Sequence, residues 1–284
     1  EIRFCDWSSD VCSSDLKKIA VVGGGPAGLA CAHRLATKGH EVEIFEARPK
    51  AGGLNEYGIA AYKTVDNFAQ AEVDYVTAIG GISFSHGIAL GRDIDLADLT
   101  PRYDAVFLAI GLGGVNALGG ADVETPGSDD AIAWIEDLRQ ASDLAKIPVG
   151  RRVVVIGGGM TAIDAAAQAK GLGAEEVTIC YRGPKERMKA SAYEQEVAQT
   201  RGVLIRFDMQ PLRVIASGGT VAGMEFGRNG ETVLIECDQI FKAIGQTLES
   251  DVLGNGAAPI ELTGRIKVAG SRSEERRVGK ECRS

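Results

Sequence analysis

Three glycines near the start of the chain have the spacing of a phosphate-binding turn. Gly23, Gly25 and Gly28 follow the apolar run 19–22 in the pattern G-x-G-x-x-G. The first glycine permits a tight turn, the second lets backbone N–H groups approach a pyrophosphate, and the third lets the next helix pack closely on the strand. Pro26 suits the first position of that helix. The turn, including Pro26 and Ala27, is therefore predicted to bind a dinucleotide.

An acidic residue stands where such a site contacts the adenosine ribose. Glu46 follows Gly28 at roughly the 20-residue interval of dinucleotide sites, at the end of an expected strand at 41–46. A carboxylate here accepts hydrogen bonds from the ribose and repels a 2′-phosphate. The first site is thus predicted to hold FAD or NAD and not NADP. A purely structural turn is the alternative.

The same pattern occurs a second time in the middle of the chain. The apolar run 153–156 leads into Gly157, Gly159 and Ala162, spaced G-x-G-x-x-A. Gly158, Met160 and Thr161 fill the positions between them. Two copies this far apart in one chain favour two nucleotide-binding domains, each with its own ligand.

The two patterns differ at the position that contacts the adenosine ribose. Aligning 177–182 with 42–47 places Tyr181 opposite Glu46, and Arg182 comes next. Arg187 and Lys189 follow in the same loop. Because three cations could pair with a 2′-phosphate, the second site is predicted to take NADPH, with NADH left open. A solvated loop without a ligand is the alternative.

A chain with both sites favours hydride transfer from nicotinamide C4 to flavin N5. The cofactors perform this reaction and the protein supplies alignment, so no catalytic side chain and no metal ligand are predicted. Cys31 and Cys180 are interpreted as buried structural thiols. None of the six cysteines is paired as C-x-x-C, which excludes a dithiol exchange site and disfavours a thioredoxin reductase. Cysteine usage indicates a reducing, cytoplasmic setting.

Composition indicates a small-molecule enzyme. The 284 residues have room for about two domains, and 45% of them are hydrophobic. No apolar run approaches the roughly 18 residues of a membrane span. The net charge of −8 argues against a nucleic-acid or anionic-membrane partner.

The predicted fold is α/β, with two Rossmann-like dinucleotide-binding domains, the second inserted in the first, and an antiparallel β-meander. FAD-binding segments are expected at 17–117 and 239–271, and an NAD(P)H-binding domain at 118–238. The strings 1–16 and 272–284 match no helix or strand period and look like translated sequencing-adapter read-through; natural disordered tails are the alternative.

Several elements must position the two sites. Asp66 is expected to cap a helix that buries Phe68, Val73, Val76 and Ile79. Further helices are expected near 129–145 and at 161–170. Strands are expected at 82–84, 88–90, 104–111, 177–181 and 265–268. The meander should begin at 203, with hairpin turns at 218–219 and 229–230. The strand 239–245, QIFKAIG, echoes VFLAIG at 106–111 and is expected to return to the first domain.

Several motifs together resemble the electron-input flavoproteins related to the glutamate synthase small subunit: GGGPAG, GGLNEYGIAAYK, VFLAIG, GGGMTAID and FKAIGQ. Within them, GLNEYGIAAYKT and MKASAYEQE are most similar to the NAD-dependent dihydropyrimidine dehydrogenase input subunit of bacteria. The resemblance covers about residues 17–271. It implies that electrons pass from NAD(P)H through FAD to iron–sulfur clusters, in a region outside this chain or in a partner subunit that reduces uracil or thymine.

The resemblance also implies which residues hold the cofactors. FAD would be held by the first glycine motif, Glu46, Gly53, Leu54 and Lys63. NAD(P)H would be held by the turn 158–161, Arg182, Lys189 and the strand end from Ala243 to Gly245. A glutamate synthase small subunit and a silent dinucleotide-binding fragment are the alternatives. The family usually has a cysteine-bearing region before the first motif and a Gly-Asp segment after the last, so an interior fragment of a longer protein is expected.

Overall fold

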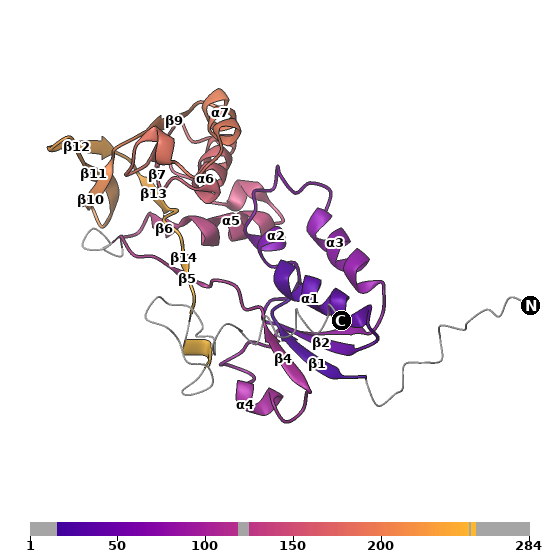
Figure 1. Ribbon diagram of the computed structural model, residues 1–284. Helices are drawn as coiled ribbons and strands as arrows, with labels where there is room; N and C mark the ends of the chain where they lie inside the picture. Colours follow the sequence, from indigo (N-terminus) through magenta and orange to yellow (C-terminus); the bar gives the residue numbers. More distant parts are fainter. Residues whose placement is uncertain (1–15, 119–124, 250, 254–284) are drawn as a thin grey trace, which may run out of the picture. The chain divides into compact units, whose positions relative to one another are not determined.

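The computed structural model describes residues 16–118, 125–249 and 251–253 (Figure 1). The expected terminal strings, apart from Leu16, and the strand at 265–268 lie outside the described residues. The chain divides into two compact units. Of the described residues, the first unit contains 16–56, 66–113, 248–249 and 251–253, and the second contains 57–65, 114–118 and 125–247.

Parallel strands form the sheet of the first unit in the order β3-β2-β1-β4. They are β1 (Lys18–Val22), β2 (Glu41–Glu46), β3 (Ile82–His86) and β4 (Ala105–Leu108). Successive residues of β1 enter different hydrophobic cores, Val21 with Leu29 and Leu35, and Ala20 with Leu99 and Tyr103. This two-sided burial explains why the strand reads as a continuous apolar run.

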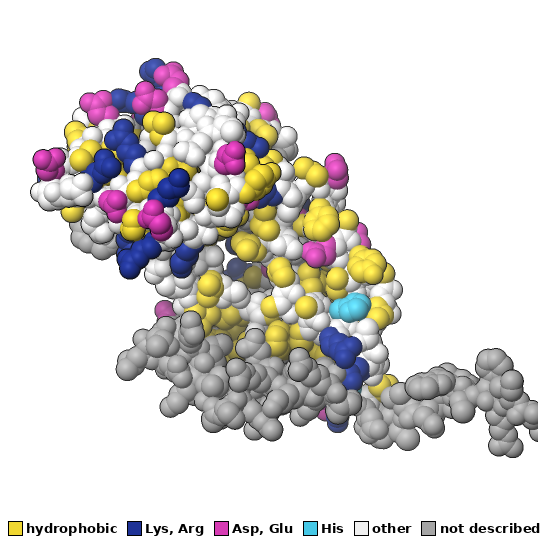
Figure 2. Space-filling view, turned by 45° about the horizontal axis from the view of Figure 1, so that its top comes forward, with side chains coloured by type: hydrophobic (Ala, Val, Ile, Leu, Met, Phe, Trp, Pro, Cys, Tyr) yellow, Lys and Arg dark blue, Asp and Glu magenta, His cyan; other side chains and the backbone are white. Residues whose placement is uncertain are grey.

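Along the chain, the strands of the first unit alternate with helices α1 (Pro26–Ala36), α3 (Phe68–Thr77) and α4 (Leu96–Leu99). Helix α3 begins one residue later than Asp66 would place it, because Asp66 and Asn67 both have left-handed backbone angles and Asn67 is the N-cap. Val73 is buried and Val76 packs against the same core, as expected. The prediction that Phe68 and Ile79 are buried is wrong: they are 55% and 46% exposed. Figure 2 shows exposed hydrophobic side chains in yellow.

The second unit has its own parallel sheet, in the order β6-β13-β7-β8-β9. Its strands are β6 (Ser128–Asp130), β7 (Arg152–Ile156), β8 (Glu176–Cys180), β9 (Val203–Arg206) and β13 (Gln239–Lys242). Its helices are α5 (Ala131–Gln140), α6 (Met160–Gly171) and α7 (Ala192–Thr200). Helix α5 is shorter than expected because β6 precedes it and Ala141 is extended.

A three-stranded antiparallel meander follows, formed by β10 (Gln210–Ser217), β11 (Thr220–Arg228) and β12 (Glu231–Glu236). Both predicted hairpin turns are confirmed, with positive φ at Gly218, Gly219, Asn229 and Gly230. The meander begins at β10 and not at residue 203, because β9 pairs parallel with β8. Phe226 packs with Val154 and Ile156, so the meander shares a core with the parallel sheet.

The expectation that residues 239–245 return to the first domain is wrong. Strand β13 lies between β6 and β7 in the second sheet, and the chain returns to the first unit only at Leu248. The order β9-β8-β7-β13 repeats β3-β2-β1-β4. The sequences VFLAIG and FKAIG are therefore similar because β4 and β13 have the same place in their own units.

The remaining elements are short. They are α2 (Leu54–Tyr57), the antiparallel pair β5 (Gly114–Val115) and β14 (Gln246–Thr247), and the 3-10 turns at Leu144–Lys146, Lys185–Arg187 and Asp251–Leu253. The expected strand at 88–90 is reduced to one bridge between Leu90 and Ile94.

Candidate functional site

The turn between β1 and α1 excludes side chains at two of its glycines. A Cβ on Gly23, whose φ is +109°, would lie 2.2 Å from the carbonyl oxygen of Ala109, which directly follows β4. A Cβ on Gly28 would lie 1.9 Å from the carbonyl oxygen of Gly23. These approaches give the turn its tightness and the helix its close packing. Gly25 is the N-cap of α1, and no side chain of the described residues caps this helix.

Glu46 lies at the end of β2 and holds the glycine turn in place. Its Oε2 accepts a hydrogen bond from the N–H of Gly24 at 2.7 Å, and its Oε1 accepts one from Arg48 at 2.8 Å. The side chain is 7% exposed. Because each carboxylate oxygen can accept two hydrogen bonds, the same group can also bind ribose hydroxyls. The structure thus gives Glu46 a role in shaping the turn that the sequence did not indicate.

The loop after β2 reaches the same turn. The N–H of Gly52 donates to the carbonyl of Gly24 at 2.8 Å, and a Cβ on Gly53 would lie 2.7 Å from the Cα of Gly25. Leu54 begins α2 and is exposed. The described residues of the first unit therefore bring together Gly23, Gly25, Gly28, Glu46 and Gly53, a set that fits the adenosine and pyrophosphate of FAD.

Lys63 belongs to the second unit. Its ammonium group lies 2.5 Å from Asp164 on α6 and 2.9 Å from Glu194 on α7. Burial acts to lower the pKa of Lys63, but the hydrogen bonds to these two carboxylates outweigh it and raise the pKa. The role toward FAD that the family resemblance implied for Lys63 stays a prediction.

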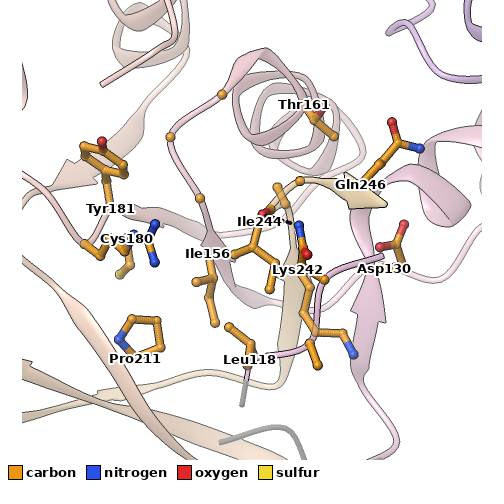
Figure 3. Close-up of a pocket in the computed structure, with 18 of the residues that line it drawn as sticks. Leu118, Asp130, Ile156, Thr161, Cys180, Tyr181, Pro211, Lys242, Ile244 and Gln246 are labelled. Atoms are coloured by element: carbon orange, nitrogen blue, oxygen red, sulfur yellow. Dashed lines mark hydrogen bonds between the residues drawn. The ribbon is translucent and has the colours of Figure 1, made fainter. Parts of the chain in front are cut away.

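A pocket of about 620 Å³ opens at the carboxyl ends of the second unit's strands (Figure 3). Eight of the residues predicted to bind NAD(P)H line it: Gly157, Gly158, Gly159, Thr161, Arg182, Lys189, Ala243 and Gly245. Two others do not line it. Met160 is the exposed first residue of α6, and Ala162 is fully buried in the core beneath the helix.

The glycines of this second turn have distinct surroundings. A Cβ on Gly157 would lie 2.2 Å from the carbonyl oxygen of Ala243, as Gly23 does from Ala109 in the first unit. A Cβ on Gly158 would lie 2.4 Å from the ring of Tyr181. A Cβ on Gly159 would meet no neighbouring heavy atom within 4 Å. The turn therefore leaves open space at the start of α6, where backbone N–H groups can bind a pyrophosphate.

Tyr181 takes the place that Glu46 has in the first unit, and it orders the cationic loop. Its hydroxyl donates to the carbonyl of Arg187 at 2.8 Å, and its ring lies against Gly158 and Gly183. Arg182 and Lys189 line the pocket, whereas the side chain of Arg187 is not part of its lining. A neutral ring and two cations thus replace the carboxylate that would repel a 2′-phosphate.

The opposite side of the pocket contains residues that sequence reasoning missed. Asn116, Asp130, Lys242 and Gln246 line it, and the amide of Asn116 donates to the carbonyl of Ile244 at 3.2 Å. Asp130 caps α5, a signal present in the sequence as an aspartate directly before an apolar helix. Its place at a ligand pocket follows only from the pairing of β6 with β13.

Of the described cysteines, Cys180 is buried as predicted and Cys237 is buried too, whereas Cys31, also predicted to be buried, is only partly buried. Burial raises the pKa of Cys180, at the pocket wall, and of Cys237 to about 12. The described residues contain no group of three or more His, Cys, Asp or Glu side chains that could hold a metal ion. Within the same residues, no helix combines the length and apolar character needed to cross a membrane.

Comparison with known proteins defines the class. The family model for pyridine nucleotide-disulphide oxidoreductases matches residues 17–272. The chain belongs to this family and has its FAD/NAD(P)-binding oxidoreductase fold. FAD and NAD(P)H, the cofactors predicted from the two glycine motifs, are those of this fold.

Relatives of known name share a substantial part of the sequence. The NADPH-Fe(3+) oxidoreductase subunit beta of Geobacter sulfurreducens is 36% identical over 251 residues, covering 81% of this chain and 37% of that protein. The glutamate synthase [NADPH] small chain of Escherichia coli is 35% identical over 221 residues, covering 75% of this chain and 47% of that protein. The matched part is thus less than half of either relative. The chain resembles NAD(P)H-dependent flavin oxidoreductase subunits. This confirms the general class of protein that the sequence motifs predicted.

Solved structures agree on the fold. FprA of Mycobacterium tuberculosis in complex with NADPH has a TM-score of 0.76 at 19% identity, covering 91% of this chain and 76% of FprA. Thioredoxin reductase of T. acidophilum has a TM-score of 0.67 at 19% identity, covering 94% of this chain and 95% of that one. At this level of identity the likeness concerns the fold alone.

Proposed function

We propose that this chain is the electron-input part of a flavoprotein complex, binding FAD in its first unit and NAD(P)H in its second. The observation that carries the proposal is the second unit's pocket, a single cavity lined by Gly157, Gly158, Gly159, Thr161, Arg182 and Lys189. The first unit supplies a matching glycine turn, in which the N–H of Gly24 donates a hydrogen bond to Glu46. When bound, the two cofactors would supply the chemistry, hydride transfer from nicotinamide C4 to flavin N5 followed by release of electrons from the flavin.

The protein's own groups bind and orient in this proposal. The open space beside Gly159 admits the pyrophosphate of NAD(P)H to the start of α6. Arg182 and Lys189 pair with a 2′-phosphate, so NADPH is the preferred nucleotide. In the first unit, Glu46 binds the adenosine ribose of FAD while it holds the glycine turn through Gly24.

The final electron acceptor lies in a partner. Our first candidate is a cluster-bearing subunit that reduces uracil or thymine to the dihydropyrimidine, supported by the sequences GLNEYGIAAYKT and MKASAYEQE. A glutamate synthase-like partner is the second candidate, favoured by the 35% identity to the small chain of that enzyme. A dinucleotide-binding module without turnover is the third.

Changing Arg182 and Lys189 together to Ala tests the nucleotide assignment. The Kd for NADPH should rise at least tenfold, or about 1.4 kcal/mol, while the Kd for NADH changes little, because only NADPH carries the extra phosphate. Binding is measured by quenching of protein fluorescence. The control changes Lys185 and Arg187 to Ala, which removes the same charge from the same loop but leaves the pocket lining intact.

Two results would contradict the assignment. Equal losses for NADPH and NADH in the pocket variant would mean that the cations bind the pyrophosphate or stabilise the fold. Equal losses in the pocket variant and the control would mean that the net charge of the loop acts from a distance. The acceptor is tested separately, by adding a cluster-bearing pyrimidine reductase subunit and following uracil-dependent oxidation of NAD(P)H against glutamine-dependent oxidation with a glutamate synthase large subunit.

A further inference from the structure

Asp130 lines the pocket, and one of its carboxylate oxygens is buried without a hydrogen-bond partner among the described residues. Asp130 ends strand β6 and caps α5, with its Oδ1 accepting hydrogen bonds from the N–H groups of Ile132 at 2.7 Å and Ala133 at 3.0 Å. Its Oδ2 is buried and has no hydrogen-bond partner among the described residues. Because a buried acceptor without a donor is costly, this oxygen is expected to receive a donor from a molecule that fills the pocket.

The order of the strands tells which part of a dinucleotide comes near Asp130. In the proposed binding mode the adenosine half would lie where β8 ends, at Tyr181 and Arg182, and the pyrophosphate would lie at the start of α6. The other half must then extend across β13 toward β6, whose last residue, Asp130, is paired with Lys242. Figure 3 shows Asp130 on the side of Lys242 and Gln246, away from Tyr181.

The chemistry of a carboxylate selects among the groups of the ligand. A carboxylate oxygen repels phosphate but accepts hydrogen bonds from N–H and O–H groups. The half of NAD(P)H beyond the pyrophosphate offers such donors in its carboxamide and its ribose hydroxyls. We propose that Asp130 is a specificity-determining residue that accepts a hydrogen bond at Oδ2 from the nicotinamide riboside half of NAD(P)H. This inference rests on the proposed function of the pocket.

The variant Asp130→Asn tests the role of Oδ2 separately from the helix cap that Oδ1 provides. Asparagine retains one side-chain oxygen and is an equally good N-cap, so α5 keeps its cap, while the acceptor at Oδ2 becomes a donor. The Kd for NADPH should rise about tenfold, and the Kd for 2′,5′-ADP, which has only the adenosine half, should stay the same. Asp143→Asn is the matched control, because Asp143 caps the 3-10 turn at 144–146 through Ala145 and does not line the pocket.

A second comparison identifies the donor on the ligand. If the carboxamide donates, the unchanged protein should bind NADP⁺ more tightly than nicotinic acid adenine dinucleotide phosphate, whose carboxylate would face Asp130, and Asp130→Asn should reduce that preference. If a ribose hydroxyl donates, Asp130→Asn should weaken both dinucleotides equally. Either result supports the proposal, provided that binding of 2′,5′-ADP is unchanged.

The outcomes that overturn the inference are separate from those that overturn the proposed function. If the unchanged chain binds neither NADPH nor 2′,5′-ADP, the pocket is not a nucleotide site. If both bind and Asp130→Asn leaves the Kd for NADPH unchanged, Oδ2 has no ligand donor and the inference is wrong. It is also wrong if Asp130→Asn weakens 2′,5′-ADP as much as NADPH, because Asp130 then acts through the shape of the pocket.

Discussion

The ammonium group of Lys63 lies 2.5 Å from Asp164, and this pair fixes a short segment of chain on helix α6. Tyr62 donates its hydroxyl to the same carboxylate at 3.3 Å, and the N–H of Ala60 donates to it at 3.4 Å. The guanidinium of Arg201 lies 4.2 Å from the centre of the Tyr62 ring. Residues 57–65 thus belong to the second unit, although the chain on both sides of them belongs to the first.

Asp164→Ala should therefore destabilise the protein by about 1–3 kcal/mol, because it removes the acceptor of the Tyr62 hydroxyl and of the Ala60 N–H and leaves Lys63 paired with Glu194 alone. Urea unfolding at neutral pH measures the change in the free energy of unfolding. Arg151→Ala is the control, since Arg151 and Glu175 form an exposed ion pair, for which about 0–1 kcal/mol is expected. A loss for Asp164→Ala no larger than that of the control would show that the segment is held by other contacts.

The local chemistry of the two glycine turns could be predicted from the sequence because it depends on residues that are close along the chain. Gly23 and Gly157 are required by backbone approaches that only glycine permits, and each follows a buried strand. The exchange of Glu46 for Tyr181 could be predicted for the same reason. These local features are sufficient to predict both candidate sites from the sequence.

Long-range pairing could not be predicted in the same way. The sequence of β13 is equally compatible with either sheet, because both have a strand followed by A-I-G in the same relative position. Asp130 was missed because its place at the pocket depends on β6 pairing with β13, distant in sequence. Phe68 was expected to be buried, but α3 packs through Ala69 and Val73. In each case the tertiary contact, and not local preference, decides the outcome.

Glu46→Ala should weaken the binding of FAD and loosen the glycine turn. The carboxylate makes charge-assisted hydrogen bonds to the N–H groups of Gly24 and Arg48, each worth about 1.5–3 kcal/mol. The Kd for FAD, measured by flavin fluorescence, should rise at least tenfold, and thermal unfolding without FAD should occur at a lower temperature. Glu41→Ala, at the exposed start of the same strand, is the control. An unchanged Kd for FAD would remove Glu46 from the cofactor site.

The hydrogen bond between Tyr103 and Glu43 should make stability depend on pH at both extremes. The Tyr103 hydroxyl donates to Glu43 at 2.5 Å. Burial and this bond raise the pKa of Tyr103 to about 12. Burial acts to raise the pKa of Glu43, but the hydrogen bonds from Tyr103 and Ser85, with Lys18 and Arg102 nearby, hold it below its ordinary value.

The two pKa shifts determine how the stability of the protein changes with pH. The raised pKa of Tyr103 contributes stability that is complete below about pH 10 and is lost as the pH rises toward 12. The lowered pKa of Glu43 contributes stability that is present above about pH 4.5 and is lost as the pH falls. Tyr103→Phe should therefore cost about 1.5–3 kcal/mol between pH 5 and 9, and less outside that window.

Urea unfolding of Tyr103→Phe and of the unchanged chain, from pH 4 to pH 11, tests this dependence. Tyr75→Phe is the control, because Tyr75 is 80% exposed and its removal should change the free energy of unfolding little at any pH. The difference between Tyr103→Phe and the unchanged chain should form a plateau at neutral pH that declines on both sides. A difference that stays constant over the whole range would show that Tyr103 stabilises the first unit through ring packing against Phe45 and not through Glu43.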